Sequence, residues 1–211
     1  MSGITAALED GLLILTMDKP ARRNFSDAEP NPAICAVVLT GIGGNYSAGR
    51  DIRDLKATAS FAEARDRFAV VKDLIGRIVR FPKPLVSAVE GWAVGAGFGI
   101  ALACERVVAA ETTSIGAGPG PRLFVTSVAI DAKDGKRLGF VDALAPKGEA
   151  LTKPKAIAQE EASVAPLARS YIKDFLAQKA DRARIRTPDP ADAVEGRAAF
   201  FEKRAPIFRG E

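Results

Sequence analysis

The chain has 211 residues, of which 47% are hydrophobic and 27% charged, a composition typical of a soluble globular protein with one sizeable core. No apolar run approaches the ~20 residues that span a bilayer, and residues 1–20 lack the basic and apolar segments of a signal peptide. We therefore expect a cytoplasmic protein without a membrane partner. The absence of histidine excludes Ser-His and Cys-His nucleophiles and leaves proton transfer to a carboxylate, Tyr, Lys, Cys or water.

The net charge of +4 comes with a cluster of basic residues from Lys179 to Arg186. A nucleic-acid site would need aromatic stacking platforms beside such charges, but no aromatic residue lies between Phe175 and Phe200. We therefore interpret the cluster as a solvated helix face and expect no nucleic-acid partner.

The two cysteines, Cys35 and Cys104, each lie in an apolar segment. This placement predicts two buried free thiols rather than a disulfide, as in a reducing compartment. No metal-ligand spacing is present, so we expect no metal site.

Apolar patterning predicts the elements in chain order. We expect a hairpin of strands at 3–8 and 11–17, a turn at 20–25 that includes Asn24, strands at 35–40, 85–89 and 106–110, helices at 60–80 and 97–104, a loop at 116–121, and helices at 167–179 and 191–203. Strands alternate with helices in the first part and helices dominate the last, which predicts an α/β core over residues 1–145 and a helical region over residues 146–211.

A glycine-rich turn, Gly95-Ala96-Gly97, follows the strand at 85–89 and opens an apolar helix. The first amides of a helix have no intrahelical acceptor, and the helix dipole favours negative charge there. Glycines before a buried helix more often serve close packing, so this turn alone is weak evidence for a site.

A second such turn, Ser47-Ala48-Gly49, follows the strand at 35–40 and precedes Arg50. If the two turns face one another, their amides can point at one oxygen. Paired backbone amides of this kind form an oxyanion hole, which stabilises charge that develops on a carbonyl group during a reaction.

Both turns lie in segments that resemble motifs of the crotonase superfamily, the enoyl-CoA hydratase/isomerase family. Residues 46–52, YSAGRDI, resemble its FSAGxDL motif, and residues 83–105 resemble its KPvIAAVnGxaxGGGxxLALacD motif. Three further blocks follow the family's order, at residues 13–24, 131–142 and 195–208.

The resemblance implies a crotonase-like spiral of repeated ββα units with a helical C-terminal trimerisation region, assembled as a homotrimer or homohexamer. It also implies an acyl-CoA thioester substrate. Coenzyme A would then enter as part of that substrate, with no cofactor bound permanently.

Carried over residue by residue, the resemblance implies that the oxyanion donors are the backbone amides of Arg50 and Ala96. Ala96 replaces the family's middle glycine, which is tolerable if its φ is negative. We expect Asp51 to brace the turn or cap the following helix. The residues expected around coenzyme A are Arg23, Ala48, Gly49, Asp51, Ile52, Gly95 and Lys203.

Two departures limit the functional inference. Gly99 occupies the position of one hydratase glutamate, and residues 118–121 read GPGP where the family has its second. The two-glutamate hydration mechanism is therefore disfavoured, while isomerisation, hydrolysis and decarboxylation stay open. A non-catalytic subunit that binds coenzyme A or serves assembly is the alternative.

The chain is also short for the family between residues 25 and 33 and between residues 123 and 126. Either it lacks a helix and an active-site segment there, or the sequence represents only part of a longer polypeptide. We favour the second explanation, because loss of a core-covering helix would expose the apolar face of the sheet beneath it.

Overall fold

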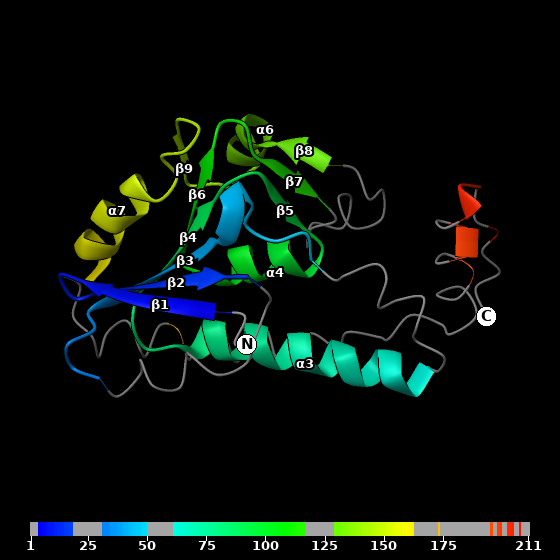
Figure 1. The fold of residues 1–211 in the computed structure, drawn as a ribbon, viewed down its shortest axis with the longest axis horizontal. Coiled ribbons are helices and arrows are strands. Elements are labelled where there is room, and N and C mark those ends of the chain that lie inside the picture. Colours follow the sequence, from blue (N-terminus) through cyan, green and yellow to red (C-terminus); the bar gives the residue numbers. More distant parts are fainter. Residues whose placement is uncertain are drawn as a thin grey trace.

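The computed structural model describes residues 4–18, 31–49, 61–116 and 129–162, with residues 173, 195, 198–199, 202–204 and 207. Two sheets organise this part of the chain (Figure 1). One has six strands in the order β1-β2-β3-β4-β6-β9, and the other has three in the order β5-β7-β8. The mixed α/β fold expected from the sequence is present.

The chain opens with a hairpin, as predicted. Strand β1 (Ile4–Glu9) pairs antiparallel with β2 (Leu12–Met17). Between them, Asp10 and Gly11 have φ angles of 46° and 79°, and an Asp-Gly pair at positive φ is typical of a two-residue hairpin turn.

The other strands of the large sheet run parallel to β2. Parallel sheets are covered on both faces, so their strands are apolar almost throughout. Strand β3 is buried except at its last residue, and every residue of β4 is buried. These strands are β3 (Ala36–Gly41), β4 (Leu85–Val89), β6 (Arg106–Ala110) and β9 (Ala143–Ala145).

Helices cover the two faces of the large sheet (Figure 1). Val37 and Leu39 of β3 belong to the core cluster that includes residues of α3 (Phe61–Arg80) and α4 (Ala96–Ala103), whereas Val38 belongs to the cluster of α7 (Thr152–Ala162). Side chains alternate along a strand, so one strand supplies both cores.

The small sheet was not predicted. It consists of β5 (Trp92–Val94), β7 (Ser114–Gly116) and β8 (Ala129–Asp131), each too short to show an alternating pattern. Gly116 is therefore the last residue of a strand and not the start of the expected loop. Helix α6 (Ala132–Arg137) follows, with Asp131 as N-cap accepting from the Asp134 amide at 2.7 Å.

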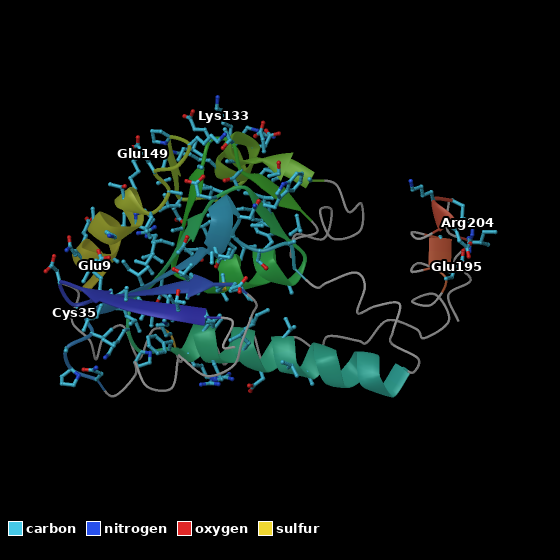
Figure 2. All side chains as sticks on the ribbon, in the orientation of Figure 1. Glu9, Cys35, Lys133, Glu149, Glu195 and Arg204 are labelled. Carbon is cyan, nitrogen blue, oxygen red and sulfur yellow. The ribbon has the colours of Figure 1, made fainter. Side chains whose placement is uncertain are left out.

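One cysteine prediction is confirmed and the other is wrong. Both thiols are free, and Cys104 is buried, but Cys35 is exposed. Figure 2 shows Cys35 beside the β1–β2 turn, where its amide donates to the Gly11 carbonyl at 2.7 Å. Ile34 and Ala36 on either side are buried, so the alternating backbone directs the intervening thiol outward.

Lys173, the one described residue of the helix predicted at 167–179, is helical and contacts the segments just before β4 and β6. Its ammonium group donates to the Glu105 carboxylate and, at 3.5 Å, to the Lys83 carbonyl.

None of the helices in the described ranges is both long and apolar enough to span a membrane. The predicted turn at 20–25 and the basic cluster at 179–186 lie outside the described residues.

Candidate active site

The two glycine turns meet in the structure. The Ser47 amide donates to the Trp92 carbonyl at 2.9 Å, and the Val94 amide donates back to the Ser47 carbonyl at 3.0 Å. These bonds form an isolated parallel bridge between Ser47 and Ala93. Because this bridge is backbone pairing, it fixes the register of one turn against the other.

Close packing at this contact requires glycine at two positions. Gly49 has a φ of 76°, and a Cβ atom there would lie 2.6 Å from the Val94 carbonyl oxygen and 3.4 Å from the Ala96 nitrogen. A Cβ atom on Gly97 would lie 2.5 Å from the Ser47 Cβ. The packing role of these glycines is therefore what brings the turn beside the Ala96 amide.

Ala96 is the first residue of α4, and its N-cap is Gly95 at φ 55° and ψ −125°, a backbone conformation that favours glycine. The first helical hydrogen bond of α4 is donated by the Gly99 amide to the Gly95 carbonyl, at 3.1 Å. Within the described ranges, the Ala96 amide has no acceptor. Ala96 is not among the described residues with positive φ. Its φ is therefore compatible with alanine in place of the family's middle glycine.

In the Ser47–Gly49 turn, the amide expected to act as a donor is the one that follows Gly49. The Gly49 amide is already occupied, because it donates to the Ser47 hydroxyl oxygen at 3.1 Å. Ala48 is exposed beside it. The expected second donor, the amide of Arg50, lies outside the described residues, as do the side chains of Arg23, Asp51 and Ile52.

Two carboxylates near the strand ends are engaged in structural contacts. Glu90 accepts from the Ala150 amide at 3.0 Å, and Glu105 accepts from the Leu85 amide at 2.8 Å besides its contact with Lys173. Gly99 supplies no side chain, and a Cβ atom there would lie 3.4 Å from Ile75 Cδ1 of α3. In the described part of the chain, no cluster of potential metal ligands is found.

A buried polar chain beneath the turns was missed by the sequence analysis. The Tyr46 and Ser87 hydroxyl oxygens lie 2.9 Å apart, and Ser87 Oγ lies 3.4 Å from the Ala101 carbonyl oxygen and 3.2 Å from Cys104 Sγ. Burial raises the pKa of Cys104 to about 12 and holds the pKa of Tyr46 well above its usual range, so both groups stay protonated at neutral pH. The available signal was a hydroxyl at position 87 inside an apolar strand.

Near the C-terminus, Lys203 is exposed and has a φ of 53°. The Arg204 amide donates to the Ala199 carbonyl at 3.1 Å, which is the long bond of a helix-ending motif whose left-handed position is usually glycine. No ion pair involves Lys203 among the residues that are described.

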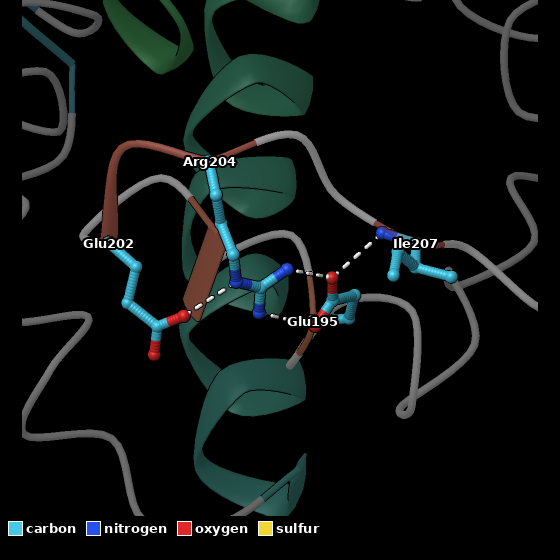
Figure 3. Close-up of polar contacts among 4 residues, drawn as sticks. All are labelled: Glu195, Glu202, Arg204 and Ile207. Atoms are coloured by element: carbon cyan, nitrogen blue, oxygen red, sulfur yellow. Dashed lines mark hydrogen bonds and ion pairs between the residues drawn. The ribbon is translucent and has the colours of Figure 1, made fainter.

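The neighbouring Arg204 is held by two carboxylates (Figure 3). Its guanidinium contacts both oxygens of Glu195, at 2.5 and 2.9 Å, and Glu202 at 2.6 Å. The hydrogen bonds that the Arg204 guanidinium donates to these carboxylates raise the pKa of Arg204. The Ile207 amide also donates to Glu195, at 2.7 Å. These contacts therefore connect the segment around Ile207 to the helical residue Glu195.

The sequence matches a family described as enoyl-CoA hydratase/isomerase over residues 15–123, a span that includes both turns. A putative enoyl-CoA hydratase of Thermus thermophilus is 32% identical, with 92% of this chain and 96% of the relative aligned. The 2,3-dehydroadipyl-CoA hydratase of Escherichia coli is 26% identical, with both chains aligned in full over 257 positions. Since this chain has 211 residues, that relative carries segments with no counterpart here.

A solved structure gives the same indication. The crystal structure of an enoyl-CoA hydratase from Polaromonas sp. JS666 superposes with a TM-score of 0.74 at 29% identity and covers 98% of this chain and 99% of its own. The likeness therefore includes the two turns and the sheets that position them.

Proposed function

Because the chain belongs to the enoyl-CoA hydratase/isomerase family, we propose that it is an enzyme that processes an acyl-CoA thioester. The observation that carries this proposal is the contact between the two glycine turns, with the Ala96 amide at the start of a helix beside Gly49. Coenzyme A enters as part of the substrate and is not a resident cofactor.

In this proposal the thioester carbonyl oxygen lies between the Arg50 and Ala96 amides. Proton removal next to the carbonyl, or attack on it, places negative charge on that oxygen, and the two N–H groups with the α4 dipole stabilise it. Such donors contribute to the rate because they bind the transition state more tightly than the ground state. Removing one donor of this kind typically lowers kcat by about 10²–10³-fold.

The carboxylates near the strand ends limit which of the family's reactions the protein can catalyse. Gly99 has no side chain, and Glu90 and Glu105 accept backbone hydrogen bonds, so none of the three supports a two-glutamate hydration. Isomerisation, hydrolysis and decarboxylation use the same oxyanion and need a different proton carrier. A water molecule or another carboxylate would supply it.

Coenzyme A is an anion, and we assign the binding of its phosphates to Arg23 and to Lys203, the latter from a neighbouring subunit. The contacts of Arg204 with Glu195 and Glu202 fix the backbone around Lys203. The protein would then be a homotrimer or homohexamer built on the spiral of ββα units. Light scattering tests this assembly, and a monomer would contradict it.

The alternative is a non-catalytic subunit that keeps the fold and binds coenzyme A. The absence of a glutamate at Gly99 favours it. Incubation with a panel of acyl-CoA thioesters, followed by mass spectrometry, separates the possibilities. Turnover of a thioester supports the enzyme. Binding without chemistry on any thioester supports the alternative. If the protein neither binds nor turns over any thioester, both possibilities are overturned.

A further inference from the structure

In the buried chain beneath the turns, the hydrogen bonds that satisfy every donor all run in one direction. Among the described residues, the Tyr46 hydroxyl has Ser87 as its only polar partner, so it must donate to Ser87 to satisfy its hydrogen. Ser87 then donates to the Ala101 carbonyl or to Cys104, and the Cys104 thiol donates to the Ile100 carbonyl at 3.6 Å. The chain therefore has a direction, from the turn to the helix.

Its two ends lie on the two segments that carry the proposed oxyanion donors. Tyr46 directly precedes the Ser47–Gly49 turn. Ala101 lies in the last turn of α4 and Cys104 is the C-cap of that helix, whose first amide is that of Ala96. Ser87 of β4 joins them, so the link passes through the centre of the large sheet, where all these side chains are buried.

We infer that Tyr46 and Ser87 are positioning residues that fix the spacing between the two amide donors. This inference rests on the proposed function. Oxyanion donors must lie about 2.7–3.1 Å from the charged oxygen, and a displacement of about 1 Å costs on the order of 10²-fold in rate. A satisfied hydrogen-bond chain in a close-packed core resists such a displacement.

A purely structural role would not need the hydroxyl groups. The backbone of the turn is already held at Tyr46, whose amide donates to the Glu90 carbonyl at 2.8 Å. A Phe and an Ala would fill the same core positions without any buried polar group. What the hydroxyl pair adds is a directed link from the turn to α4.

Three variants separate positioning from stability. Ser87→Ala leaves the Tyr46 hydroxyl buried without a partner and is expected to lower the free energy of unfolding most. Tyr46→Phe leaves Ser87 its bond to the Ala101 carbonyl. The double variant removes both hydroxyls, so its stability is expected to recover toward that of the unmodified protein, because no buried group lacks a partner.

The rate is expected to behave differently from the stability. All three variants should lower kcat for an accepted thioester by about 10-fold or more with little change in KM, since the donors act mainly on the transition state. The double variant should stay slow although its stability recovers. Thr113→Val is the matched control, because it also removes a buried hydroxyl that donates to a backbone carbonyl, that of Val89 at 3.0 Å.

Amide hydrogen exchange in the ligand-free protein tests the inference without substrate. The Ser47 and Val94 amides, which join the turns, should exchange faster in the double variant, while the Asp142 amide, bonded to the Val107 carbonyl at 2.8 Å, should not change. If no thioester is turned over by the unmodified protein, the proposed function fails and exchange alone decides the inference. Exchange and kcat in the double variant equal to those of Thr113→Val would overturn it.

Discussion

Gly49 packs directly against Val94, with room for hydrogen but not for a methyl group. A Cβ atom on Gly49 would lie 2.6 Å from the Val94 carbonyl oxygen, at a φ of 76°. We expect Gly49→Ala to separate the two turns, to lower kcat/KM on an accepted thioester by about 100-fold and to reduce the free energy of unfolding by about 1–3 kcal/mol. Steady-state kinetics and urea unfolding measure these effects.

Gly44→Ala is the control for this variant. Gly44 ends the short 3₁₀ helix η1 (Ile42–Gly44) and has a φ of 72°, but no atom of the described residues lies within 4 Å of a Cβ atom placed there. Its substitution therefore carries only the cost of the left-handed conformation, about 1 kcal/mol. Equal losses of activity in the two variants would show that close approach at Gly49 does not matter.

A second pair of glycines lies on one helix. A Cβ atom on Gly97 would lie 2.5 Å from the Ser47 Cβ, whereas one on Gly99 would meet, among the described residues, only Ile75 Cδ1, at 3.4 Å. We expect Gly97→Ala to destabilise the protein and Gly99→Ala to be neutral or stabilising, by up to about 1 kcal/mol, because alanine favours the helix. Thermal unfolding of both variants checks this order, and a reversed order would contradict the contact between Gly97 and Ser47.

The Lys173–Glu105 pair is expected to be worth more than the surface pair Lys155–Glu9. The side chain of Lys173 is 9% exposed and that of Lys155 34%. Lys173→Met leaves Glu105 poorly solvated and should lower the free energy of unfolding by about 3 kcal/mol or somewhat less, while Lys155→Met should change it by less than about 1 kcal/mol. Urea unfolding gives both values, and similar losses would refute the difference in burial.

The two thiols should react at very different rates with a thiol reagent. Cys35 is exposed, whereas Cys104 is buried with its pKa raised from 9.0 to about 12. One equivalent should be labelled quickly in the native protein and the second only on unfolding. Cys35→Ser should abolish the fast phase, and a fast phase that survives this substitution would place the reactive thiol elsewhere.

The same shift predicts a loss of stability in alkali. Because the folded-state pKa of Cys104 exceeds its unfolded value, the unfolded chain releases a proton first as pH rises, and stability falls from about pH 9 toward pH 12. Tyr46, whose pKa is also raised, acts in the same direction. Unfolding followed across this pH range should give a smaller slope in Cys104→Ser, and an unchanged slope would contradict the burial of the thiol.

Long apolar segments made much of the fold predictable. The strands Leu12–Met17, Ala36–Gly41, Leu85–Val89 and Arg106–Ala110 and the helices Phe61–Arg80 and Ala96–Ala103 lie within about two residues of their predicted bounds, because a strand or helix that must bury apolar side chains shows its period in the sequence. The three-residue strands of the small sheet show none. They exist because neighbouring backbones pair with them.

The sequence by itself determined the family, the two glycine turns and the absence of a side chain at Gly99, since these depend on residue identity and local order. Only the tertiary structure decided that Gly49 and Gly97 are glycines for close approach and that Cys35 faces outward. It also placed the hydroxyl oxygens of Tyr46 and Ser87, which are 41 residues apart in the sequence, 2.9 Å from each other. Contacts between distant segments depend on packing and strand register, and neither leaves a periodic signal along the chain.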